Sequence, residues 1–189
     1  RFMASPDQPD VAIETLKQAN RIAPDSEQGR RFKVTNRQLR MSIYYLSASD
    51  ETSARQELLA DGSDVSEEVM SRRLSAAYVD LCYRMIQLQR GGTSLPESYP
   101  KWLNRAVELD PRQAGAYGLA ADFALRSNDL ESFVWNLRKA LEAGAPLQSV
   151  VQVLGPARDK YPLYRPINDL WRELVPDEQP SQDEQTPPP

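Results

Sequence analysis

Three segments of the chain carry nearly the same spacing of apolar residues ahead of a proline, and this repetition constrains the fold more than any other feature. The three sets are Ala12, Leu16, Ala19 and Pro24; Tyr99, Leu103, Ala106 and Pro111; and Phe133, Leu137, Ala140 and Pro146. Intervals of three and four residues place side chains on one face of an α-helix, and a proline ends one helix but can begin the next. The pattern therefore predicts helices that end at equivalent points.

Helical spacing of apolar residues continues through most of the chain, and strand-type alternation is nearly absent. Ser66 is expected to cap a long helix, and Gly144 is expected to end another in a left-handed conformation. Gly155 and Pro156 are expected to break a helix near the C-terminal end. The predicted helices cover 10–22, 26–48, 51–60, 66–90, 96–109, 113–127, 130–143, 147–160 and 165–174.

One segment has the length and composition of a complete helix-turn-helix unit. Pro111 and Pro146 are 35 residues apart, about the length of one unit in periodic helical arrays. The apolar and small residues of its two halves are Tyr117, Leu119, Ala120, Ala121 and Ala124, then Phe133, Leu137 and Ala140, and the turn between them holds Asn128 and Asp129. With this aromatic-then-small first helix, Asn-Asp turn and small residue before the proline, residues 113–146 resemble a tetratricopeptide (TPR) repeat.

Residues 10–24 and 99–111 resemble the second helix of such a repeat. Because Pro24 and Pro111 are 87 residues apart, which is not a multiple of about 34 residues, we expect a divergent array with insertions. The resemblance implies an all-α fold of antiparallel helix-turn-helix repeats, stacked as a short right-handed α-solenoid. It implies one repeat domain over 1–175, in which 147–174 form a C-terminal cap.

Residues 176–189 contain proline and acidic residues but no apolar anchor, so they are expected to form a disordered tail.

Composition limits the classes of function. The chain has 23 Lys and Arg against 27 Asp and Glu, a net charge of −4, so no overall positive field favours nucleic acid. It contains no histidine, which argues against zinc sites and histidine-based catalysis. The single cysteine, Cys82, lies among apolar residues and is expected to be buried. No catalytic or cofactor-binding constellation is recognised, and no apolar run is long enough to span a membrane.

The resemblance implies a concave surface, lined by first helices, that binds peptides or partner proteins. In the clearest unit this surface would present Gly115, Gly118, Asp122 and Arg126. Some TPR domains bind a partner's terminal carboxylate here through Lys and Asn, but Gly118 and Asp122 occupy the matching positions, which argues against such a clamp. The simpler interpretation is that these four are solvated or small packing residues.

A basic stripe is the sharpest local feature. Arg30, Lys33, Arg37 and Arg40 recur at helical intervals, so they are predicted to share one helical face. Such a face could bind an acidic peptide, phosphates or anionic lipid headgroups. The simpler interpretation is a solvated charged face, paired with the acidic tail. Charge reversal at Arg37 and Arg40 is predicted to weaken partner binding and its salt dependence.

Three aromatic residues near the end of the chain, Tyr161, Tyr164 and Trp171, are expected to pack under the cap rather than form a ligand pocket.

The favoured hypothesis is a noncatalytic protein-protein interaction scaffold that binds a peptide or partner protein. An alternative is a regulatory or accessory segment of a larger, membrane-anchored or soluble enzyme, which the start at Arg1 on half a repeat favours. A nucleic-acid-binding helical repeat is a third hypothesis, supported by the basic stripe and opposed by the net charge.

Overall fold

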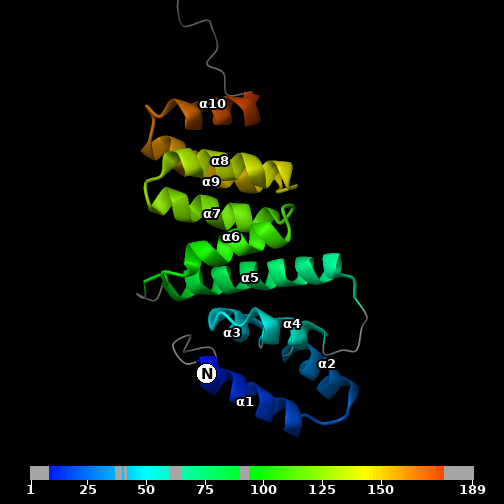
Figure 1. The fold of residues 1–189 in the computed structure, drawn as a ribbon. Helices are drawn as coiled ribbons and strands as arrows, with labels where there is room; N and C mark the ends of the chain where they lie inside the picture. Colours follow the sequence, from blue (N-terminus) through cyan, green and yellow to red (C-terminus); the bar gives the residue numbers. More distant parts are fainter. Residues whose placement is uncertain (1–8, 37–39, 41, 60–64, 90–93, 177–189) are drawn as a thin grey trace, which may run out of the picture.

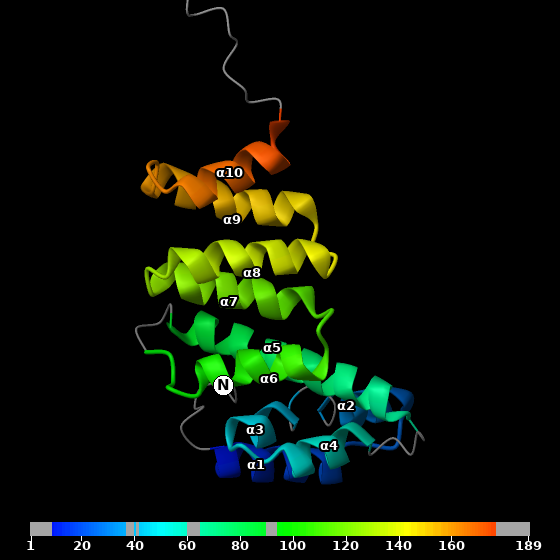
Figure 2. The same ribbon diagram turned by 45° about the horizontal axis from the view of Figure 1, so that its top comes forward.

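The part of the chain that the structure describes is helical. The computed structural model describes residues 9–36, 40, 42–59, 65–89 and 94–176, and these ranges hold ten α-helices and no strand. The helices are α1 (Pro9–Ile22), α2 (Glu27–Thr35), α3 (Ser42–Ser47), α4 (Glu51–Leu59), α5 (Glu67–Gln89), α6 (Tyr99–Leu109), α7 (Ala114–Arg126), α8 (Leu130–Glu142), α9 (Leu147–Lys160) and α10 (Arg165–Leu174). They lie in layers from α1 at one end to α10 at the other (Figures 1 and 2). The all-α prediction is confirmed.

Each predicted helical segment except 26–48 corresponds to one helix. That segment instead holds α2 and α3, and Asn36 and Arg40 between them have π-helical geometry. The predicted break at Gly155 and Pro156 is wrong, because α9 continues through Pro156. Pro156 and Gln152 are both exposed, so water can reach the Gln152 carbonyl that lacks its usual backbone N–H donor.

Short polar side chains begin four of the helices. In each case an oxygen of Ser or Asp accepts a hydrogen bond from the backbone N–H three residues later, which satisfies a donor that the first helical turn leaves unpaired. The pairs are Ser26 with Gly29, Asp50 with Ser53, Ser66 with Val69, and Asp129 with Ser132. The predicted cap at Ser66 is confirmed.

Three helices end in a residue with left-handed backbone geometry. The φ angles are 62° at Ser49, 59° at Asn128 and 93° at Gly144. In each case the next residue donates its N–H to the carbonyl five positions earlier, at 2.8 to 2.9 Å, which closes the helix. The prediction for Gly144 is confirmed, and the same ending recurs at α3 and α7.

The helices pack in a regular order. Neighbours in sequence pack as the pairs α3 with α4, α5 with α6, α7 with α8 and α9 with α10. The odd-numbered helices also pack in succession, α1 on α3, α3 on α5, α5 on α7 and α7 on α9. They therefore form one continuous row, and we call the surface along that row the odd-helix face.

The repeated apolar spacing marks equivalent helices in part. Its three helical positions are buried in α6, at Tyr99, Leu103 and Ala106, and in α8, at Phe133, Leu137 and Ala140. The remaining segment lies in α1, which packs on α3. Second helices also pack on the next odd helix, as α6 does on α7 and α8 on α9, so the assignment of residues 10–24 as a second helix stays a prediction.

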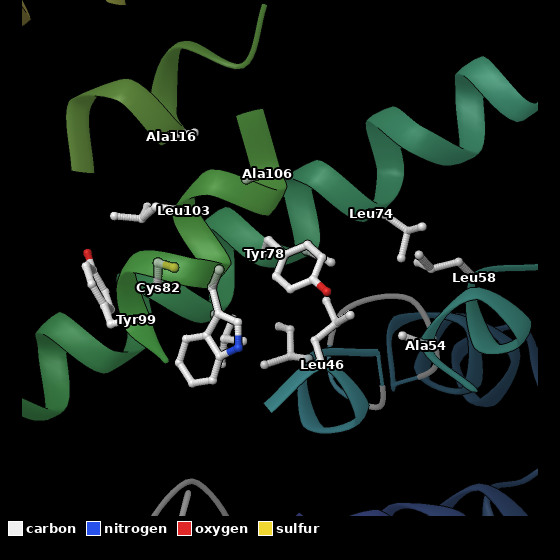
Figure 3. Close-up of a cluster of buried hydrophobic side chains, with 14 of the residues drawn as sticks. Leu46, Ala54, Leu58, Leu74, Tyr78, Cys82, Tyr99, Leu103, Ala106 and Ala116 are labelled. Atoms are coloured by element: carbon white, nitrogen blue, oxygen red, sulfur yellow. The ribbon is translucent and has the colours of Figure 1, made fainter. Parts of the chain in front are cut away.

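The core consists of two large apolar clusters that meet at α7. Ala116 belongs to the cluster that extends from α3 to α7, whereas Ala121 and Ala124 belong to the cluster that extends from α7 to α10. Figure 3 shows the first cluster, in which Ala106 of α6 and Ala116 of α7 lie on the same side as Leu103. Small residues let helix backbones approach closely, so the alanines of α7 allow it to pack on both sides.

Candidate protein-interaction surface

Two cavities lie along the odd-helix face. Cavity A, of about 370 Å³, lies between α1, α3 and α5. Its lining residues are Thr15, Leu16, Arg40, Ile43, Tyr44, Ser47, Asp80, Leu81, Tyr83, Arg84, Met85, Gln87 and Leu88. Most of these side chains are apolar or aromatic, as in sites that bind ligands or partner side chains.

Cavity B, of about 610 Å³, lies between α5, α7, α8 and α9. Its apolar wall includes Val79, Leu119, Val150 and Val153. Asp80 and Tyr83 line both cavities, so the cavities adjoin at α5. We call the two together the odd-helix trough.

Two glycines of α7 give cavity B its depth. Gly115 and Gly118 are exposed and line the cavity. A Cβ atom at Gly115 would lie 3.2 Å from Cγ1 of Val79, so this glycine lets α5 and α7 approach closely. A Cβ atom at Gly118 would meet nothing within 4 Å. The absent side chain at Gly118 therefore leaves open space in the trough.

Asp122 and Arg126, predicted to bind a partner, pair with each other. Arg126 Nε lies 2.7 Å from Asp122 Oδ2, and Arg126 Nη1 donates to Gln89 Oε1 at 2.7 Å. Neither residue lines cavity A or B. Because the carboxylate is already paired, we expect it to repel an anionic partner less than the sequence suggested.

The structure divides the predicted basic stripe. Arg30 donates to the backbone carbonyl of Asp25, and Lys33 Nζ lies 3.1 Å from the Asp25 carboxylate. Arg40 lines cavity A instead, and Arg37 lies outside the described residues. Two of the four cations thus point to the turn before α2, while one faces the trough.

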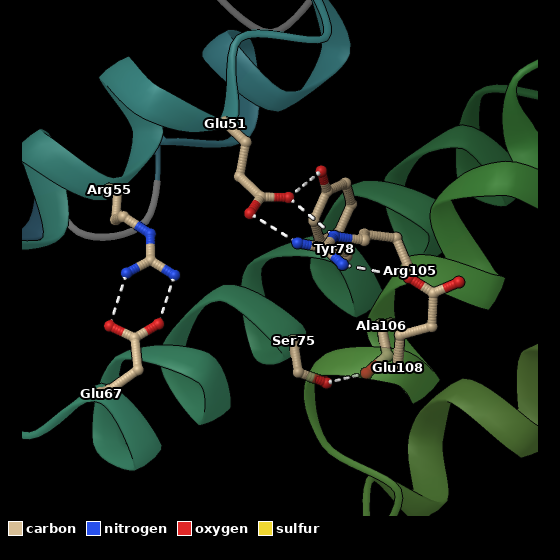
Figure 4. A network of polar contacts seen from close by, with 8 residues as sticks. All are labelled: Glu51, Arg55, Glu67, Ser75, Tyr78, Arg105, Ala106 and Glu108. Carbon is tan, nitrogen blue, oxygen red and sulfur yellow. Dashed lines mark hydrogen bonds and ion pairs between the residues drawn. The ribbon is translucent and has the colours of Figure 1, made fainter.

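A polar network that the sequence did not indicate connects α4 to α5 and α6 (Figure 4). Arg105 donates two hydrogen bonds of 2.9 Å to the Glu51 carboxylate, which also accepts one of 3.0 Å from the Tyr78 hydroxyl. The bonds from Arg105, with a smaller contribution from Tyr78, lower the pKa of Glu51. Because Glu51 lies 54 residues from Arg105, no local pattern could reveal the pair.

A second link between α5 and α6 is buried. The Ser75 hydroxyl donates a hydrogen bond of 2.7 Å to the backbone carbonyl of Ala106 (Figure 4). This carbonyl also accepts the N–H of Asp110, so one acceptor serves two donors at the helix junction.

The aromatic residues near the end of the chain pack as expected. Tyr161, Tyr164 and Trp171 are partly buried against the cluster that extends from α7 to α10. The Arg158 guanidinium lies 4.9 Å from the centre of the Trp171 ring, a distance suited to a cation-π contact.

The predicted burial of Cys82 is confirmed. Its side chain is fully buried, and this burial raises the pKa of the thiol to about 12.

Groupings of acidic, cysteine and histidine side chains that could hold a metal ion are absent from the described residues. Among the helices of the described ranges, none is both long and apolar enough to cross a membrane. Comparisons with known proteins gave no match to a family model, a curated protein or a solved structure.

Proposed function

We propose that this chain is a noncatalytic protein-protein interaction scaffold that binds a peptide segment of a partner along the odd-helix trough. The observation that carries the proposal is the adjacency of cavities A and B, which meet at Asp80 and Tyr83. A trough over several helices suits an extended or helical segment better than a small molecule.

The order of helix packing supports a TPR-like assignment within this proposal. Antiparallel pairs, with first helices packed in succession along one side, are the arrangement of stacked helix-turn-helix repeats. On this assignment the chain is a short right-handed α-solenoid with α10 as its C-terminal cap, and its odd helices line the concave surface.

Filling the trough tests the proposal. Peptides of twelve residues would be selected from a displayed library on the 189-residue chain and measured by fluorescence anisotropy. Gly118→Arg places a long side chain in cavity B without an internal clash at Cβ. We expect it to weaken binding about tenfold or more, because it occupies the space of the peptide.

The matched control is Asn104→Arg, which adds the same charge at an exposed position of α6 outside both cavities. This variant is expected to bind within about twofold of the unaltered chain. Equal binding by Gly118→Arg, or no peptide enrichment, would refute a binding role for the trough.

A further inference from the structure

Cavity A has an unpaired cation on its wall. Arg40 is exposed and lines the cavity, and within the described part of the chain its guanidinium group makes no hydrogen bond or ion pair. The other lining cation, Arg84, is 3.1 Å from the Asp80 carboxylate. Two cations and one carboxylate leave the lining of cavity A with one positive charge.

The rest of the wall favours an apolar group. Leu16, Ile43 and Leu81 are buried and line the cavity, and Met85 and Leu88 add partly buried side chains. The volume of about 370 Å³ lies within the range of roughly 300 to 1,000 Å³ that ligand sites occupy. Cavity A therefore combines room for a large apolar side chain with one positive charge.

We propose that cavity A receives a large apolar side chain of the bound segment while a carboxylate of the same segment pairs with Arg40. This inference rests on the proposed function, because it names the chemistry of the peptide that occupies the trough. The partner is thus an acidic segment with an apolar anchor.

Two observations favour a peptide over other anions. Cavity A shares Asp80 and Tyr83 with cavity B, so a peptide that leaves the first cavity at α5 can extend towards the second. A nucleic acid would need several free cations to neutralise successive phosphates, whereas the lining of cavity A has a single unpaired one.

The experiment uses peptides selected on the 189-residue chain, each resynthesised with its Asp and Glu residues changed to Asn and Gln. On the unaltered chain, we expect this change to weaken binding about three- to tenfold, because it removes a charge-assisted hydrogen bond at an exposed arginine. On the Arg40→Gln variant, the same change in the peptide is expected to weaken binding less than about twofold.

Two further variants control for charge and folding. Arg31→Gln removes a cation at a site that faces Glu27 and lies outside cavity A, so it should preserve the acid dependence. Arg40→Lys retains the positive charge and should preserve most of the acid dependence of binding. Alanine in place of the large apolar residue of the peptide is expected to weaken binding about tenfold or more.

The outcomes separate this inference from the proposed function. If Gly118→Arg abolishes binding but Arg40→Gln leaves the acid dependence intact, the trough binds peptides and the role assigned to Arg40 is wrong. If Gly118→Arg weakens the binding of none of the selected peptides, the proposed function fails, and this inference fails with it. Binding of 4-phenylbutyrate that requires Arg40, without binding of any peptide, would identify cavity A as a site for free apolar carboxylates and overturn the peptide assignment.

Discussion

Replacing Glu51 with alanine removes the acceptor of the polar network that connects α4 to α5 and α6. The carboxylate accepts two hydrogen bonds from Arg105 and one from Tyr78. The side chains of Glu51 and Arg105 are 27% and 42% exposed, so solvent weakens the pair without eliminating it. Hydrogen bonds to charged groups contribute about 1.5–3 kcal/mol to stability when they are shielded from water, whereas exposed ion pairs contribute about 0.2–1 kcal/mol. Because this network lies between the two cases, we expect Glu51→Ala to lower the free energy of unfolding by about 1.5 kcal/mol.

This loss should be visible in thermal and chemical unfolding. For a chain of 189 residues, a loss of about 1.5 kcal/mol lowers the Tm by roughly 3–6 °C. A double-mutant cycle of Glu51→Ala and Arg105→Ala, followed by urea unfolding, would measure the coupling between the two side chains. We expect about 1 kcal/mol of coupling, because each residue is the main partner of the other.

The stabilisation should also depend on pH in a defined direction. The pKa of Glu51 in the folded protein is lowered from its ordinary value of 4.5, so the contribution is fully present above that value. It is lost as the pH falls through the folded-state pKa. The difference in unfolding free energy between the unaltered chain and Glu51→Gln should therefore shrink as the solution is acidified below about 4.5.

The pair of Arg55 and Glu67 provides a matched comparison. It also connects α4 to α5 through two hydrogen bonds, but the Glu67 side chain is 73% exposed. We expect Glu67→Ala to lower the Tm less than Glu51→Ala does, because solvent screens the exposed pair. Equal losses for both substitutions, or no coupling between Glu51 and Arg105, would refute the argument from burial.

Four further predictions test packing and burial. Gly118→Ala should stabilise the chain by about 0.5–1 kcal/mol, because alanine is the better helix former and its Cβ meets open space. Gly29→Ala should lower the Tm, because its Cβ would lie 1.8 Å from the Pro24 carbonyl oxygen. Thermal unfolding should show a raised Tm for Gly118→Ala and a lowered Tm for Gly29→Ala. A Gly29→Ala variant as stable as the unaltered chain would contradict the packing of α2. Ser75→Ala should cost about 1 kcal/mol in urea unfolding, since it removes a buried hydrogen bond to a carbonyl of α6. The thiol of Cys82 should react with a disulfide reagent only at the rate of unfolding, because it is buried and its pKa is raised to about 12; rapid labelling of the folded chain would disprove this.

Local patterns predicted the helices well because the signals that start and end them lie within a few residues. Ser66 accepts the backbone N–H of Val69, and Gly144 adopts the left-handed conformation that ends α8. Pro156 was misjudged because its effect depends on which side of α9 faces solvent, and that is a tertiary property.

The candidate site was only partly accessible from the sequence. Arg40 was recognised as part of a helical stripe, but its neighbours in cavity A come from α1, α3 and α5. Asp122 and Arg126 were recognised as a pair of charges on one face, yet their mutual ion pair leaves them less available to a partner. Spacing along one helix cannot show which other helix faces it.

By itself, the sequence determined the all-helical class and the ends of most helices, because capping and helical periodicity act over four or five residues. Only the tertiary structure decided that the odd helices form one row, that cavities A and B adjoin at Asp80 and Tyr83, and that Glu51 pairs with Arg105. The physical reason is that packing brings together side chains that are far apart in the sequence. Which of them become neighbours depends on shape and burial summed over several helices.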